Sequence, residues 1–163
     1  MEFLDVVDED DNVIGKASKE DVYKNKLRHR IVHIVIFNKK GELALQLRSK
    51  NVHFCPRHWS TAVGGHVQSG ETSEEAALRE CQEELGVKVE IEFLSKDLYR
   101  VEGIPEKFLI TFTAKYEGPF NIDSFAVERA DFFSLASVQE MIDDGEKFHP
   151  ELLFILRKHF GIK

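Results

Sequence analysis

Glutamates are concentrated in the stretch from Gly65 to Val87, where six of them are opposed by Arg79 alone. Apolar residues recur there at spacings of three and four, which predicts a helix. On that helix Glu80, Glu83 and Glu84 share an arc about 100° wide, and like charges at this spacing repel one another. A solvated acidic face is one interpretation. The other is a site for a divalent cation such as Mg²⁺, held by carboxylates and substrate phosphates.

The spacing of the fixed residues is more specific than their charge. A glycine is followed after five residues by a glutamate and after seven more by an Arg-Glu pair, and then come a Glu-Glu pair and a second glycine. This pattern resembles the Nudix box, and every fixed position is filled. Cys81 is the only imperfect match, because an aliphatic residue is usual at this position. A buried cysteine nevertheless packs as a small apolar group. The fixed residues are Gly65, Glu71, Arg79, Glu80, Glu83, Glu84, Gly86 and Val87.

Nudix hydrolases cleave a diphosphate linked to another group, using Mg²⁺ or Mn²⁺ and attack by water. The resemblance implies that Glu80, Glu83 and Glu84 are metal ligands, with Glu83 and Glu84 also candidates for catalysis. It further implies that Gly65 offers its backbone carbonyl to the metal. Arg79 would orient the carboxylates through charge-assisted hydrogen bonds, unless it only forms a surface ion pair with one of the neighbouring glutamates, Glu75 or Glu83. Glu71 is expected to fix the loop rather than to touch substrate.

Further candidates lie outside the box. Glu128, expected in a loop, is a candidate general base or extra ligand, with a solvated glutamate as the alternative. Arg48 could reach a substrate phosphate from the end of its strand, with a plain surface role as the alternative. Trp59 could stack on a base, although a lone tryptophan beside a strand is commonly a core residue. His66, which follows Gly65, is a candidate substrate-pocket residue.

The similarity extends over roughly residues 3 to 116, to type I isopentenyl-diphosphate isomerases and the Nudix hydrolases of the isomerase-like branch. In the isomerases a catalytic cysteine stands directly before the Gly-His pair, where this chain has Gly64. The second carboxylate of their Glu-x-Glu signature is also missing, since Glu106 is followed by Lys107 and Phe108. His29 matches an isomerase metal-site histidine, as His66 does, and with the partner ligands lost both are interpreted as scaffold or pocket residues. The segments that carry the likeness are Asp5–Glu9, Val13–Gly15, Leu27–Arg30, Leu47–Arg48 and Trp59–His66.

These departures favour hydrolysis over isomerisation. Glycine has no proton to exchange, so a thiol-dependent isomerisation cannot run here as it does in the relatives. The predicted function is Mg²⁺-dependent hydrolysis of a phosphoanhydride in a nucleoside diphosphate derivative or another small organic diphosphate. One alternative is an isopentenyl-diphosphate isomerase, for which only Cys55 could supply the thiol. The other is a catalytically idle Nudix domain that senses a ligand, although the intact glutamates argue against it.

Composition sets the outer limits. A chain of 163 residues with 42% hydrophobic residues predicts one soluble domain, residues 1–163, with a sizeable core. A net charge of −7 argues against a nucleic-acid polymer as partner. Cys55 and Cys81 provide no disulfide framework, so a reducing cytoplasm is expected. No signal peptide is evident at Met1–Glu9, no stretch reaches the roughly 20 apolar residues of a membrane span, and a homodimer is possible.

The order of predicted strands and helices around these residues indicates an α+β fold. The expected architecture is an α/β/α sandwich with a central mixed sheet, as in Nudix folds. Leu43, Leu45 and Leu47 alternate with Glu42, Ala44 and Gln46, which predicts a strand with one buried face. The Gly64-Gly65 pair is expected in a tight turn that a ligand can approach closely. The expected strands are Phe3–Val7, Ile31–Phe37, Glu42–Leu47, Ser60–Val63, Val87–Leu94, Leu98–Val101, Lys107–Tyr116 and Ala130–Phe133. The expected helices are Val22–Leu27 behind Ser18, the box helix ending before Gly86, Ser134–Ile142 and Pro150–Phe160.

Overall fold

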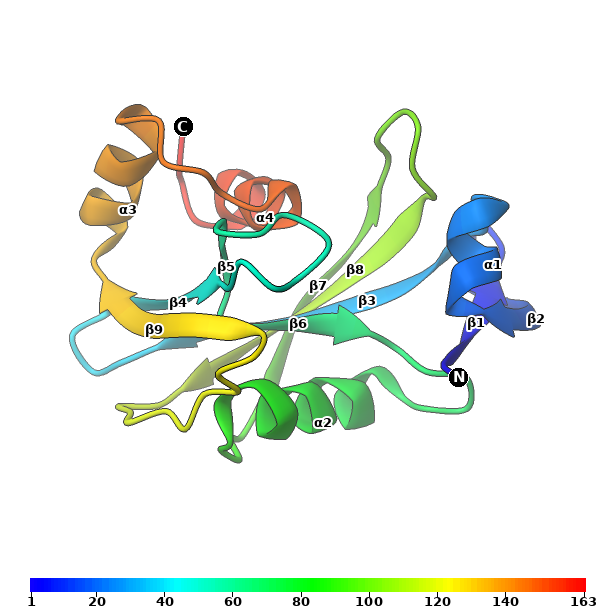
Figure 1. Ribbon diagram of the computed structural model, residues 1–163, viewed down its shortest axis with the longest axis horizontal. Helices are drawn as coiled ribbons and strands as arrows, with labels where there is room; N and C mark the ends of the chain where they lie inside the picture. The colour runs from blue at the N-terminus through cyan, green and yellow to red at the C-terminus, as the bar shows by residue number, and fades with distance from the viewer.

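The computed structural model describes residues 1–163 and contains an α/β/α sandwich with a mixed central sheet (Figure 1). Helix α2 covers one face of the sheet, and α3 and α4 cover the other. Strands run in the order β5-β4-β3-β8-β7, with β6 paired to β3 and β9 paired to β4. The elements are β1 (Phe3–Val7), β2 (Val13–Ser18), α1 (Lys19–Lys24), β3 (His29–Phe37), β4 (Leu43–Arg48), β5 (Trp59–Thr61), β6 (Val63–His66), α2 (Ser73–Leu85), β7 (Glu92–Tyr99), β8 (Lys107–Lys115), β9 (Val127–Phe133), α3 (Leu135–Asp143) and α4 (Pro150–His159).

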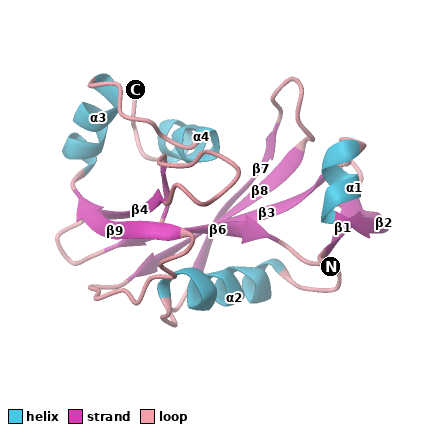
Figure 2. Cartoon of the chain, in the orientation of Figure 1, coloured by secondary structure: helices cyan, strands magenta, loops and turns pink.

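The two faces of the sheet hold two hydrophobic cores. Val32 and Ile34 of β3 belong to the core beneath α2, whereas Ile31 and Val35 belong to the core beneath α3 and α4. This split follows from the period of two in a strand, which sends successive side chains to opposite faces. The hairpin of β1 and β2 forms a separate two-stranded sheet beside the sandwich, with α1 next to it (Figure 2). No helix is both long and apolar enough to cross a membrane.

Helix boundaries follow local capping signals. Ser18 and Ser134 cap α1 and α3 by accepting a backbone N–H, and Pro150 opens α4, as the sequence predicts. At α2 the Thr72 hydroxyl and the Glu75 carboxylate form a reciprocal capping box. α1 ends at Lys24 rather than Leu27, because its last residues leave the helix at Asn25.

Two predicted strands between residues 87 and 101 are wrong in their bounds. The structure has a single strand there, β7, which begins at Glu92 opposite Thr113 and ends at Tyr99 opposite Lys107. Val87, Val89 and Ile91 precede it and pack, partly buried, against the core beneath α2. The alternation of apolar residues in this segment therefore reflects packing against the core and not a strand, because no neighbouring strand pairs with it.

Two other expectations near the site need correction. The predicted strand Ser60–Val63 is interrupted at Ala62, and the Gly64-Gly65 pair lies inside β6, paired with His33 and Val32 of β3, rather than in a turn. The expected loop at residues 121–129 ends earlier, because β9 starts at Val127.

β4 is buried on both faces, not on one. Leu43, Leu45 and Leu47 are buried as predicted, in the core beneath α3 and α4, but Ala44 and Gln46 are also buried, at 1% and 2% exposure. Helix α2 covers this second face, which a local pattern of polar and apolar residues could not reveal.

Gly86 supplies the first testable consequence. It ends α2 with φ +66°, and a Cβ built there would lie 2.7 Å from the Asn121 carbonyl oxygen. Gly86→Ala is therefore expected to lower the free energy of unfolding by about 2–4 kcal/mol, combining left-handed strain with overpacking. Gly145→Ala is the matched control, since its φ is +84° but its Cβ would meet nothing within 4 Å. Chemical denaturation should give this control only the left-handed cost of about 1–2 kcal/mol, and equal losses in the two variants would contradict the packing argument.

Candidate active site at helix α2

Gly65 lies directly against Glu80. A Cβ at Gly65 would come within 2.2 Å of the Glu80 carboxyl carbon, so no other residue fits here while Glu80 keeps this position. The Glu80 side chain is only 14% exposed. The absent side chain of Gly65 thus brings a carboxylate of α2 into contact with the backbone of β6, which is how a glycine permits close approach.

Glu84 extends from the same helix toward β4. Its Oε1 accepts a 2.7 Å hydrogen bond from the Gln46 amide, whereas Oε2 is buried and has no partner. As a whole residue Glu84 is half-buried, but its carboxyl group is the enclosed part. Burial, reinforced by the nearby Glu80 carboxylate, raises the pKa of Glu84 well above its ordinary value. Two acidic groups thus share an enclosed site with one oxygen left over.

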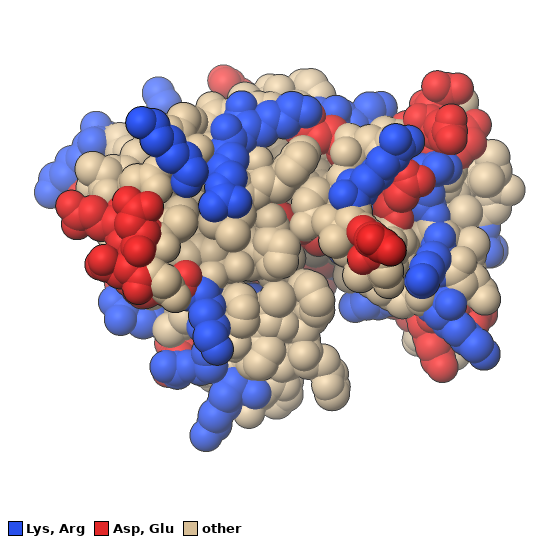
Figure 3. Space-filling model, turned by 90° about the horizontal axis from the view of Figure 1, so that it is seen from above, with Lys and Arg blue, Asp and Glu red and all other residues tan.

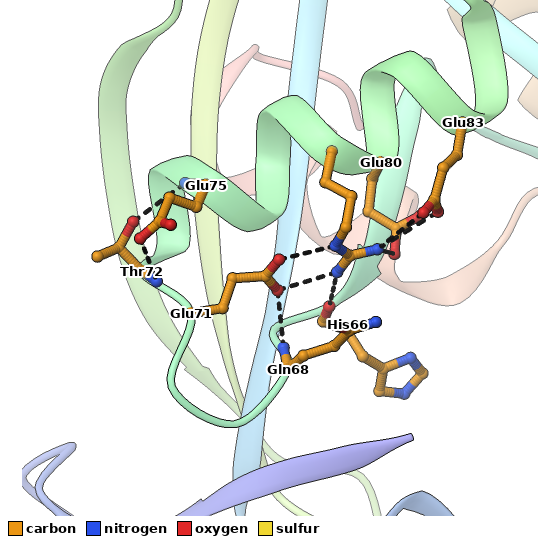
Figure 4. A network of polar contacts seen from close by, with 8 residues as sticks. His66, Gln68, Glu71, Thr72, Glu75, Glu80 and Glu83 are labelled. Atoms are coloured by element: carbon orange, nitrogen blue, oxygen red, sulfur yellow. Dashed lines mark hydrogen bonds and ion pairs between the residues drawn. The ribbon is translucent and has the colours of Figure 1, made fainter. Parts of the chain in front are cut away.

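Arg79 links the glutamates of α2 to Glu71 in the loop before the helix, through the contacts drawn in Figure 4. Its Nε and Nη2 donate to the two oxygens of Glu71 at 2.7 and 3.0 Å, and Nη2 also donates to the His66 carbonyl at 3.0 Å. Nη1 donates to Glu80 at 3.0 Å and to Glu83 at 3.3 Å. The hydrogen bonds from Arg79 hold the pKa of Glu71 below its usual value.

The loop before α2 is fixed by the same network. Glu71 accepts a 2.9 Å hydrogen bond from the Gln68 backbone N–H in addition to its bonds with Arg79. This agrees with the structural role expected for Glu71. Glu75, the other suggested partner of Arg79, instead caps the helix through Thr72.

The donor set suits a hard divalent cation. The carboxylates of Glu80 and Glu84 are oxygen donors beside the backbone of Gly65, and the unpartnered Glu84 Oε2 is an oxygen that a cation would satisfy. Glu83 is 57% exposed and turned toward Arg79. No three His, Cys, Asp or Glu side chains already converge on one point, so Glu83 would have to leave Arg79 to join the other two.

Two further candidate residues, Arg48 and Glu128, lie on the paired strands β4 and β9 near Gln46. Arg48 ends β4 on the same face as Gln46, and its Nε donates to the Phe54 carbonyl at 3.0 Å. Glu128 lies in β9 rather than in a loop, at a bulge where Leu47 pairs with Arg129 and Arg48 with Val127. Bulges commonly redirect side chains next to active sites.

The Glu128 carboxylate is paired. Both of its oxygens accept from Nη1 of Arg57, a residue with φ +62° in the loop after β4. The two side chains are 57% and 40% exposed, and such exposed pairs contribute little to stability. The structure therefore supplies Glu128 with a partner that the sequence did not reveal, and that can be displaced at low cost.

Trp59 is a core residue, which was the alternative to stacking on a substrate base. Its ring is 7% exposed, packs edge-on against Phe133 in the core beneath α4, and donates its indole N–H to Glu146 at 3.1 Å. Both its face and its polar atom are already used within the fold. Stacking on a substrate base would require opening the core.

His66 points to the opposite face of the sheet from Glu80. Its Nε2 lies 2.7 Å from the Tyr23 hydroxyl, and its ring stacks on His29 with centroids 5.6 Å apart. Burial lowers the pKa of His66 to about 3 and that of His29 to about 4, so both rings are neutral at pH 7. The structure thus separates His66 from the α2 carboxylates and places it with Tyr23 and His29.

The same face of the sheet also holds a buried ionic network that the sequence did not predict. Glu151 of α4 accepts from the Lys107 ammonium at 2.8 Å and contacts His33 Nε2 at 2.9 Å, and all three side chains are 6–7% exposed. Burial alone would raise the pKa of Glu151, but the hydrogen bond with His33 and the nearby Lys107 ammonium outweigh it and lower that pKa. The only local signal was an acidic residue in the first turn of a predicted helix, where the helix dipole favours it.

His149 joins His29 and His66 as a histidine that burial keeps neutral, and these three should make the fold acid-sensitive. Burial lowers the pKa of His29 and of His149 to about 4 in each case. In the unfolded chain these histidines bind protons near pH 6.5. Their neutral form therefore costs no stability above about pH 6.5, and the free energy of unfolding falls as pH drops from there to about 4. One such group contributes up to about 1.4 kcal/mol per pH unit. Denaturation at several pH values should show a shallower slope in His149→Asn, while exposed His53→Asn should match the wild type.

The comparisons agree with this geometry. Residues 27–154 match the family described as the NUDIX domain. The chain belongs to the Nudix family. The matched range contains the entire box, Gly65 to Val87, and α2 with its carboxylates.

Relatives within the Nudix family carry two kinds of name. An uncharacterised Nudix hydrolase of Yersinia pestis is 40% identical over 87 residues, covering 53% of this chain and 48% of the relative, so the chain spans about half of that protein's length. An isopentenyl-diphosphate Δ-isomerase of Serratia proteamaculans is 33% identical over 161 residues, covering 96% of this chain and 90% of the relative. The crystal structure of DR0079 from Deinococcus radiodurans superimposes with a TM-score of 0.86 at 25% identity, covering 98% and 99% of the two chains.

Proposed function

We propose that this chain is a Mg²⁺- or Mn²⁺-dependent Nudix pyrophosphohydrolase. It would cleave a phosphoanhydride bond in a nucleoside diphosphate derivative or another small organic diphosphate. The observation that carries the proposal is the enclosed pair of Glu80 and Glu84 beside Gly65, with Glu84 Oε2 lacking a partner. Two carboxylates in one enclosed site require a shared proton or a cation.

Each residue then has a role. Glu80, Glu84 and the Gly65 carbonyl would hold the metal, and Glu83 would join them after releasing Arg79. Bound metal supplies neutralisation of the diphosphate charge and a more acidic water. Arg79 keeps Glu80 in place, Arg48 would bind a substrate phosphate, and Glu128 would accept a proton once Arg57 releases it.

The proposed partner is a small molecule and not a nucleic-acid polymer. On the face seen in Figure 3, basic and acidic side chains are interspersed, without the continuous basic stripe that such a polymer requires. Cys55 and Cys81 are both free thiols. This is compatible with action in the cytoplasm, where thiols stay reduced, and we propose that residues 1–163 act there as one domain.

An isopentenyl-diphosphate isomerase is the second candidate, favoured by the Serratia relative that covers most of the chain. Gly64 opposes it, because the position carries no thiol or other proton donor. A Cβ at Gly64 would lie 3.3 Å from His33 Nδ1, so the site is closely filled without a side chain. Phe108 also stands where the isomerase signature has its second carboxylate.

The test is a substrate panel with Mg²⁺. Wild type and Glu84→Gln are incubated with nucleoside diphosphate derivatives, nucleoside triphosphates and small organic diphosphates, and phosphate and nucleoside monophosphate are measured. We expect release by the wild type alone, which also excludes a contaminating phosphatase. If no compound is hydrolysed by the wild type, the proposal is wrong. Conversion of isopentenyl to dimethylallyl diphosphate would establish the isomerase in its place.

A further inference from the structure

We propose that Gln46 is a positioning residue that sets the orientation of the Glu84 carboxylate for metal binding. The inference rests on the proposed function only in taking Glu84 as a metal ligand. Gln46 belongs to β4, whereas Glu84 belongs to α2, and 38 positions separate them in the chain. Gln46 lies outside the box, and the spacing of the box residues gives no indication of its role.

The hydrogen bonds of Gln46 leave its amide one orientation. Nε2 donates to the Ala62 carbonyl at 3.0 Å and to Glu84 Oε1 at 2.7 Å. An amide nitrogen has two hydrogens, and both are used here. Rotating the amide by half a turn would place its oxygen against two acceptors, so that arrangement is excluded. The backbone of the β5–β6 connection therefore holds Gln46, and Gln46 in turn holds Glu84.

This contact decides which oxygen of Glu84 is free. Oε1 is occupied by the amide, and Oε2 is buried without a partner. A carboxylate fixed at one oxygen cannot rotate freely, so Oε2 is presented in one direction. Groups that orient a metal ligand in this way raise the affinity for the metal, because the ligand already has its binding orientation before the metal binds.

Burial gives the contact its strength. Gln46 is 2% exposed, and a hydrogen bond to a carboxylate in an enclosed site is stronger than one in water. An apolar residue at this position would satisfy strand packing equally well, since Ala44, its neighbour on the same face of β4, is apolar and lies in the core beneath α2. A buried amide is costly unless it is hydrogen-bonded. The two acceptors that satisfy the Gln46 amide are the Ala62 carbonyl and Glu84 Oε1.

The test measures Mn²⁺ binding by electron paramagnetic resonance, without substrate. Gln46→Met keeps the length of the side chain and removes both donors. We expect its Mn²⁺ dissociation constant to rise by about 10- to 100-fold, the range for residues that orient ligands. Because no turnover is measured, the result is independent of whether any substrate in the hydrolysis panel is cleaved.

A double-mutant cycle separates positioning from packing. If Gln46 acts through Glu84, Gln46→Met should add almost nothing to the loss of Mn²⁺ affinity in Glu84→Gln. Ser60→Ala, a buried polar change opposite Gln46 on β5, should leave Mn²⁺ affinity as in the wild type. Gln46→Asn, which withdraws the amide by one bond, should also weaken binding and replaces Gln46→Met if that variant does not fold. Additive losses, unchanged affinity in both Gln46 variants, or no Mn²⁺ binding by the wild type would overturn the proposal.

Discussion

Glu84→Gln is expected to abolish hydrolysis while stabilising the metal-free protein. Removing a metal ligand at the reacting centre should cost several kcal/mol of transition-state stabilisation, or roughly a 10³-fold fall in kcat/KM. In the metal-free protein, the same change replaces an enclosed carboxyl group, whose pKa is raised by burial and by the neighbouring Glu80, with a neutral amide that keeps an oxygen for Gln46. The melting temperature without metal should therefore rise.

The same variant should respond differently to metal. Wild type should be stabilised by millimolar Mg²⁺ or Mn²⁺, because a ligand that binds only the folded state shifts unfolding, and Glu84→Gln should respond far less. Glu74→Gln is the matched control, since Glu74 is exposed in the first turn of the same helix. A Glu84→Gln variant that retains wild-type kcat/KM would remove Glu84 from the metal site.

Lys107→Met is expected to be the most destabilising single substitution outside the hydrophobic cores. It leaves the buried Glu151 carboxylate with His33 as its remaining side-chain partner. Removing one member of a buried ion pair typically costs about 3–5 kcal/mol, because the remaining charge is uncompensated. For a chain of this length that corresponds to a fall in melting temperature of about 10 °C or more.

Two companions test the reason for that loss. Lys115→Met changes an exposed lysine on the same strand and should alter the melting temperature little. Lys107→Met combined with Glu151→Gln removes both charges while leaving a group that can contact His33, so it should recover much of the lost stability. If the double variant is as unstable as the sum of the two single variants, the network contributes through packing and not through charge.

Much of the candidate active site was predictable because its residues are close in the chain. Glu80, Glu83, Glu84 and Arg79 lie on one helix, and their spacing determines their common face whatever the rest of the fold does. The caps at Ser18, Ser134 and Gly86 are equally local, since each satisfies backbone groups within a few residues. The family likewise followed from the spacing of the box, and the match over residues 27–154 agrees.

The partners of these residues were decided by the tertiary structure. Gln46 and Glu84 are 38 positions apart, Arg57 and Glu128 are 71 apart, and His33 and Glu151 are 118 apart. Such contacts depend on strand register and on how α2 and α4 dock on the sheet, and a one-residue change of register would send each strand side chain to the other face. The alternation in β4 therefore predicted a solvent face at Gln46, and only the packing of α2 against that face turned it into a contact with Glu84.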